Sequence, residues 1–141
     1  MKKIMLFILV ITVPGLFYGW KYFSMTFADT ADYTEQDTRK YEFYTPDILK
    51  HLPRISHIYR FHYRSVSGPN PALIYQITFS NVTDTSKINH YLEQKNYQKI
   101  DICYTAGECW QGKDPNITIS VLRKEQPDSV QVGILNEVQV D

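Results

Sequence analysis

Two arginines and one histidine are the side chains whose types and spacing best suit a binding role. Arg60, His62 and Arg64 stand two residues apart in an alternating run. Residues two apart on a β-strand point to the same face, so the spacing predicts a basic stripe on one strand face. Such a stripe can contact an anionic partner, such as an acidic protein surface, a phospholipid head group or an acidic glycan. The alternative is an ordinary solvated sheet face, and both interpretations are open at this point.

A second candidate surface lies around the two cysteines. Cys103 and Cys109 are separated by five residues, and each is followed by an aromatic residue, Tyr104 and Trp110. In an oxidising compartment we expect the two cysteines to form a disulfide. The constrained loop would then present Tyr104 and Trp110 as rigid aromatic contacts for a partner. Alternatively, Trp110 covers the disulfide or one end of the core.

Motifs of familiar catalytic sites are missing from the sequence. It contains no G-x-S-x-G, H-E-x-x-H, P-loop or dinucleotide-binding glycine pattern. Asp101, Glu108 and Asp114 cluster in the sequence, and they keep an acid-base hydrolase as a minor alternative. The four histidines fall on different expected elements or strand faces, so we expect neither a metal site nor a cofactor.

An apolar N-terminal segment determines where these groups would act. Residues 4–20 carry no charge, Lys2 and Lys3 precede them, and Lys21 follows. This length, with Trp20 at the end of the run, is typical of a single transmembrane anchor. Lys2 and Lys3 would then lie inside, with Trp20 and Lys21 flanking the anchor on the far side. These features predict an inner-membrane, single-pass protein with its domain on the periplasmic or extracellular side. The alternative is a cleaved signal peptide and a periplasmic or secreted domain.

The remainder of the chain is mildly acidic. The formal net charge is zero over 141 residues, but the N-terminal segment holds three of the 15 basic residues, leaving 12 against 15 acidic residues and a net charge of −3. This balance argues against a general nucleic-acid-binding protein. Residues 29–38 contain four acidic and no basic residues, whereas residues 39–64 contain six basic and two acidic residues. We interpret the acidic part as a polar tether.

These observations divide the chain into three parts. Residues 1–23 form the anchor or signal peptide, residues 24–40 the acidic polar tether, and residues 41–141 one extracytoplasmic domain. Within the domain, Thr45-Pro46-Asp47 predicts the start of a short helix with Thr45 as its N-cap.

Apolar periodicity predicts an α+β domain. Alternating residues indicate about five strands in a mostly antiparallel sheet, within residues 55–64, 73–80, 100–104, 117–121 and 130–134. One main helix, with Ile88 and Leu92 on one side, is expected to pack on one sheet face. Asn96 suits the left-handed position that ends such a helix, with Tyr97 folding back toward Leu92. The short helix and the N-terminal membrane-targeting helix precede this arrangement.

Taken together, the patterns predict a membrane-anchored protein-interaction module, such as an accessory subunit, an inhibitor or an immunity-type factor. The expected partners are the membrane, through the N-terminal helix, and an envelope protein. A small-ligand-binding domain and an envelope acid-base hydrolase are the alternatives.

Overall fold

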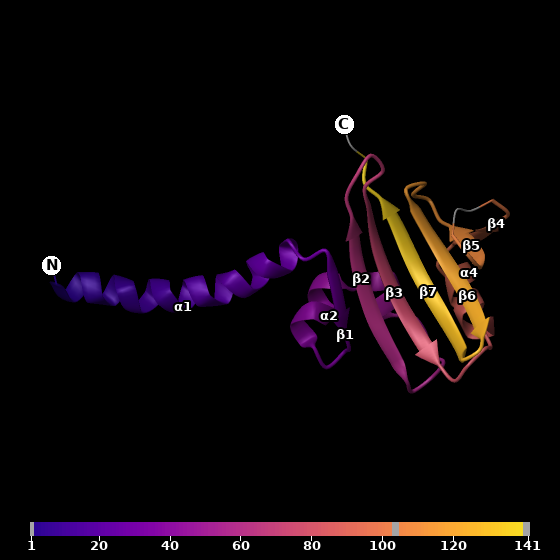
Figure 1. The fold of residues 1–141 in the computed structure, drawn as a ribbon, viewed down its shortest axis with the longest axis horizontal. Helices are drawn as coiled ribbons and strands as arrows, with labels where there is room; N and C mark the ends of the chain where they lie inside the picture. The colour runs from indigo at the N-terminus through magenta and orange to yellow at the C-terminus, as the bar shows by residue number, and fades with distance from the viewer. Residues whose placement is uncertain (1, 103–104, 140–141) are drawn as a thin grey trace.

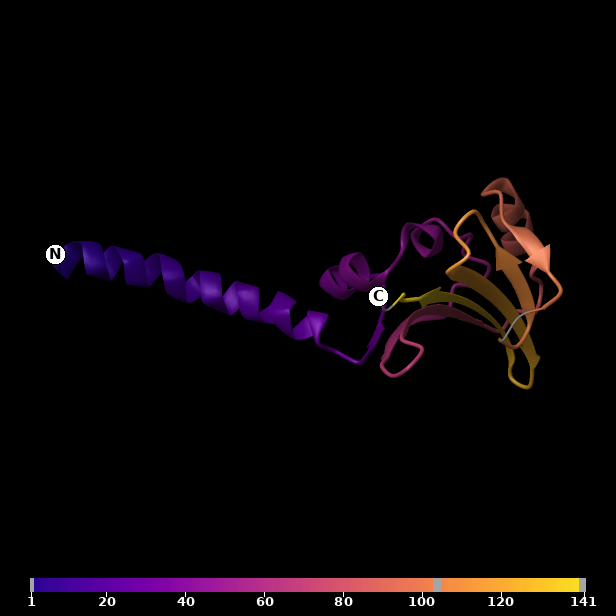
Figure 2. The ribbon, with the colours of Figure 1, turned by 90° about the horizontal axis from the view of Figure 1, so that it is seen from above.

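A long N-terminal helix extends away from a two-layer α+β domain (Figures 1 and 2). The structure, a computed structural model, describes residues 2–102 and 105–139. Helix α1 (Lys2–Thr26) contains Pro14 in its interior. The side chains of Lys2 and Lys3, predicted to flank the anchor, lie outside the described part.

The described strands form one antiparallel sheet of seven strands in the order β1-β2-β3-β7-β6-β5-β4. They are β1 (Thr30–Tyr33), β2 (Tyr59–Val66), β3 (Ala72–Ser80), β4 (Gln98–Ile100), β5 (Glu108–Gln111), β6 (Ile117–Glu125) and β7 (Asp128–Glu137). The predicted α+β class and mostly antiparallel sheet are confirmed, but the count of about five strands was too low. Strands β1 and β5 lie in segments assigned to the tether and to a loop. The third predicted strand was misplaced: β4 covers Gln98–Ile100 and shares only Ile100 with the predicted range, and Ile102 is 83% exposed.

Three short helices cover one face of the sheet, which we call the inner face (Figure 2). They are α2 (Thr38–Tyr44), α3 (Asp47–Lys50) and α4 (Ser86–Gln94). The period-two apolar residues of the sequence point to this face: Phe61, Ile77, Phe79, Val130 and Val132 are fully buried. Leu49 of α3 and Ile88 and Leu92 of α4 join the same core. The predicted main helix over one face and the predicted short helix are therefore present as α4 and α3, and α2 is a further helix beside them.

Of the two predicted helix ends, the C-terminal end of α4 is confirmed and the N-cap of α3 is not. Asn96 has φ +63°, and the N–H groups of Asn96 and Tyr97 donate to the carbonyls of Glu93 (2.9 Å) and Leu92 (3.0 Å), so the predicted Schellman ending of α4 is confirmed. The predicted Thr45 cap is wrong. Pro46 occupies the N-cap position of α3, and no described side chain caps that helix.

Thr45 packs in the core instead of capping the helix. Its side chain is buried, with its Oγ1 3.0 Å from the Tyr33 hydroxyl. Burial raises the pKa of Tyr33 to about 12, so this phenol is neutral at ordinary pH. The bond joins β1 to the start of α3.

The folded domain begins directly at the end of α1. The side chain of Met25 packs against the core, and the Tyr44 hydroxyl donates to the Met25 carbonyl at 2.7 Å. Strand β1 follows and pairs with β2, placing Tyr33 in the core at 3% exposure. The interpretation of residues 24–40 as a polar tether is therefore wrong. Asp32 stands on β1 between Ala31, which packs against the core, and Tyr33, which is buried in it.

Helix α1 leaves large apolar side chains in contact with solvent. Leu16, Phe17 and Trp20 are more than 70% exposed, and Ile11 and Phe23 more than 55%. Within the part of the chain that the structure describes, no helix is both long and apolar enough to cross a membrane.

Candidate binding surface

The sheet face opposite the helices, which we call the outer face, carries the predicted basic stripe. Strand register places Asp32, His62, Gln76, Gly133, Ser120 and Cys109 in one row across this face. Arg60 and Arg64 flank His62 on β2, with Phe61 and Tyr63 pointing to the core between them. The three basic side chains therefore share one face, as their spacing predicts.

The two arginines differ from the histidine in their contacts. Asp32 of β1 lies 2.8 Å from the His62 ring, measured from Oδ1 to Nδ1. Arg60 and Arg64 are exposed, and neither forms an ion pair with a described residue. The free positive charge of the stripe therefore resides on two guanidinium groups. Arg60 and Arg64 are four residues apart on the strand, so their Cα atoms lie about 13 Å apart.

Asp32 is the member of this surface that sequence reasoning missed. Its strand belongs to the acidic segment, and the stripe belongs to the basic segment that follows. Two acid–base side-chain pairs join these segments: Asp32 with His62, and Glu35 with Arg54 at 2.6 Å. The opposite charges of residues 29–38 and 39–64 were the available signal, since unlike charges in adjacent segments favour pairing between them.

A shallow hollow lies beside the stripe, at the β1 edge of the outer face. Its volume is about 440 Å³, and Asp32, Arg60, His62, Thr78 and Ser80 contribute to its lining. The lining combines the Arg60 cation and hydroxyl groups with the Asp32 carboxylate and the apolar side chain of Ile58, so its character is mixed.

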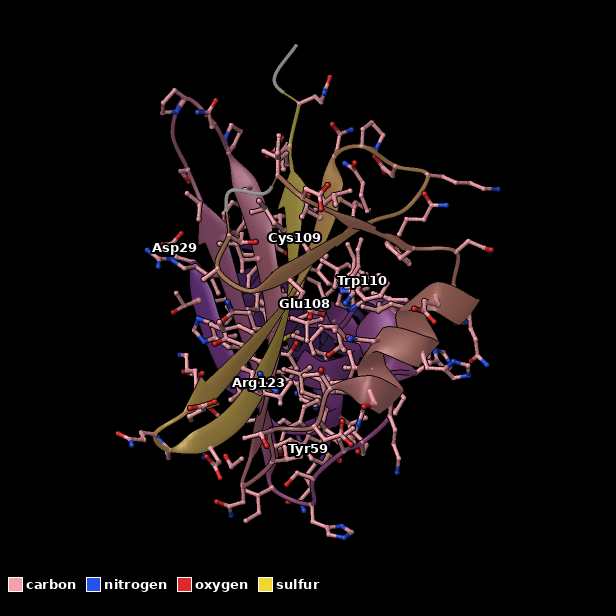
Figure 3. The ribbon with its side chains drawn as sticks, turned by 90° about the vertical axis from the view of Figure 1, so that its right-hand side faces the viewer. Asp29, Tyr59, Glu108, Cys109, Trp110 and Arg123 are labelled. Atoms are coloured by element: carbon pink, nitrogen blue, oxygen red, sulfur yellow. The ribbon has the colours of Figure 1, made fainter. Side chains whose placement is uncertain are left out.

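The second predicted surface is not assembled as expected. Trp110 is 1% exposed and lies on the inner face, where α4 covers it (Figure 3). The Lys99 ammonium stands 5.2 Å from the centre of its ring. The prediction of Trp110 as an exposed contact is therefore wrong, and the alternative of a core role holds. Tyr104 lies outside the described residues.

The predicted disulfide stays a prediction, because Cys103 lies outside the described residues. Cys109 is 2% exposed on β5, and its Sγ lies 3.2 Å from Oγ1 of Thr105. Thr105 and Ala106 lie over the outer face of β6 and β7 and border a cavity of about 270 Å³ with Gln76 and Ser120. This loop lies over the β6–β7 part of the outer face, and Arg60 and Arg64 of β2 remain exposed.

Gly107 allows the loop to approach β6 closely. Its φ is +98°, and a Cβ at this position would lie 2.4 Å from the Val121 carbonyl oxygen. Replacing Gly107 with alanine is expected to lower the free energy of unfolding by about 1–3 kcal/mol. Gly68→Ala is the matched control, because Gly68 also has positive φ but has open space around it. Urea unfolding should show the larger loss for Gly107→Ala; equal losses would mean that the close approach to β6 is unimportant.

The carboxylates considered for acid-base chemistry have separate structural contacts. Glu108 lies 2.9 Å from the Lys99 ammonium and accepts a hydrogen bond from the Asn89 amide at 3.2 Å. Asp114 accepts the backbone N–H of Asn116 at 2.9 Å. Among the described residues, no group of histidine, cysteine and carboxylate side chains is arranged to hold a metal ion.

Comparisons with protein-family models, with curated proteins and with solved structures found no match for this chain.

Proposed function

We propose that this chain is a membrane-anchored binding module whose outer sheet face receives an acidic surface of an envelope protein. Helix α1 is the anchor in this proposal, and Arg60 and Arg64 are the main contacts. Accessory subunits, inhibitors and immunity-type factors are the protein classes that fit such a module.

The exposed apolar side chains of α1 support the anchoring part. Monomeric soluble proteins rarely leave a large contiguous apolar patch in water, whereas a bilayer favours such a surface. The uncharged run of residues 4–20 and the position of Trp20 and Lys21 at its end are consistent with insertion. Lys2 and Lys3 before the run favour a cytoplasmic N-terminus. The domain would then lie on the opposite side of the inner membrane.

The observation that carries the binding part is that Arg60 and Arg64 are exposed on the outer face of β2 and form no ion pair with a described residue. Arginine binds carboxylates through two parallel hydrogen bonds, and both groups are held on a central part of β2 by its pairing with β1 and β3. Acidic side chains on a partner would pair with Arg60 and Arg64, whose charges Asp32 does not neutralise.

Reversing these charges is expected to weaken partner binding by at least about tenfold without unfolding the domain. The double variant Arg60→Glu/Arg64→Glu would be compared with Arg123→Glu/Lys124→Glu, which makes the same charge change at the exposed end of the β6–β7 hairpin. The measurement is recovery of partner with the full chain from solubilised membranes, together with the unfolding midpoint. Equal recovery by the two variants would show that the stripe is a solvated face.

A further inference from the structure

We propose that the junction of α1 and α2 binds an anionic phospholipid, with its phosphate among three cations and an acyl chain along α1. This inference rests on the anchoring of the protein by α1, and it adds a lipid class to that proposal.

The cationic part of the junction is a hollow of about 420 Å³. Lys21 of α1 and Arg39 and Lys40 of α2 line it, together with Asp37. All three cations are exposed, and none forms an ion pair with a described residue. Lys40 donates to the neutral backbone carbonyl of Asp32, at 3.5 Å.

Among the described residues, Asp37 is the one acidic side chain that lines this hollow. Its Oδ2 accepts the backbone N–H of Thr34 at 3.2 Å, in the turn that leads to α2. Three cations against one carboxylate leave an excess of positive charge, which complements a phosphate group.

An apolar hollow of about 350 Å³ adjoins the cationic one. Val13, Pro14 and Phe17 of α1 line it, and Lys21 and Arg39 border both hollows. A polar cavity continuous with an apolar one matches the two parts of a phospholipid, whereas a soluble phosphate would fill only the first.

The position of the junction agrees with this assignment. Met25 and Tyr44 dock the end of α1 onto the domain, so α2 is held beside α1 (Figure 2). Arg39 consequently lies near the aromatic part of α1, around Tyr18. Aromatic residues of membrane helices concentrate at the level of the lipid head groups, which is where the phosphate would lie.

Fluorescence of Trp20 can report which lipid occupies the junction. The full chain would be reconstituted in vesicles of equal parts phosphatidylglycerol and phosphatidylcholine, with bromine as a quencher on the chains of one lipid or of the other. Trp110 is buried in the domain and supplies a constant signal. We expect stronger quenching by brominated phosphatidylglycerol, and a fall of about fivefold in the preference for each cation removed.

The decisive variant is Lys21→Gln/Arg39→Gln, and its matched control is Arg123→Gln/Lys124→Gln on β6. Both brominated lipids should quench the fluorescence of Lys21→Gln/Arg39→Gln equally. The control variant should keep the stronger quenching by brominated phosphatidylglycerol. Equal quenching of the unmodified chain would overturn the lipid assignment while leaving the anchor intact. Absence of quenching by either lipid would overturn the anchor as well. A preference retained by Lys21→Gln/Arg39→Gln would exclude the junction as its source.

Discussion

Replacing Trp110 with alanine is expected to lower the free energy of unfolding by about 3–5 kcal/mol. The indole is 1% exposed, pairs through the backbone with Ile119 across β5 and β6, and is flanked by Lys99. Its removal would leave a large cavity beneath α4. Urea unfolding of the full chain in mild detergent, followed by near-ultraviolet circular dichroism of the tyrosines, measures the loss.

Trp20→Ala provides a matched control for this substitution, because Trp20 is 71% exposed on α1. It should leave the stability of the domain unchanged. If the two substitutions had similar effects, Trp110 would not be part of the core, and its earlier interpretation as a surface contact would regain support.

Replacing Arg54 with lysine is expected to cost about 2–4 kcal/mol, although it keeps the charge. The guanidinium donates to Glu35 twice, at 2.6 and 3.0 Å, and to the carbonyls of Leu49 and Leu52 at 3.1 and 2.6 Å. It also lies 5.6 Å from the centre of the Phe61 ring. A lysine ammonium cannot make these contacts together. Arg64→Lys on the outer face is the control. Comparable losses in the free energy of unfolding would show that the contacts of the Arg54 guanidinium do not stabilise the fold.

The same substitution should change how the free energy of unfolding depends on pH in the acidic range. Partial burial raises the pKa of Glu35, but hydrogen bonds from Arg54 and Tyr59 outweigh it and lower the pKa below its ordinary value of 4.5. The ion pair therefore stabilises the fold above that value, and the contribution is lost as the pH falls through the lowered pKa. Arg54→Lys should make this fall shallower. An unchanged slope would mean that Glu35 titrates independently of Arg54.

Much of the central sheet could be predicted from the sequence, because its strands are long and alternate regularly. The inward positions of β2, β3, β6 and β7 followed from period two, and the end of α4 followed from Asn96 and Tyr97. These features depend on local chemistry and on one buried face, both of which leave a clear pattern in the residues.

The short strands β1 and β5 could not be predicted in the same way. Strands β1 and β5 have four residues each, and their sequences, TADY and ECWQ, are too short for a period to be read. They become strands by pairing with β2 and β6. The direction of Trp110 depends on the register of β5, since a shift of one residue would bring Cys109 to the inner face. The outward position of the Arg60–Arg64 stripe was predictable, but its pairing with Asp32 required the position of β1.

The central claim is that a membrane-attached domain receives a partner on its outer sheet face, and position-specific photocrosslinking in intact cells tests it most directly. A crosslinking residue at Thr78, opposite Arg60 on β3, should yield one discrete protein adduct in the membrane fraction. That adduct should disappear with Arg60→Glu/Arg64→Glu and should not form from Glu93, which is exposed on α4. Equal adducts from Thr78 and Glu93, or adducts found only in the soluble fraction, would contradict the account.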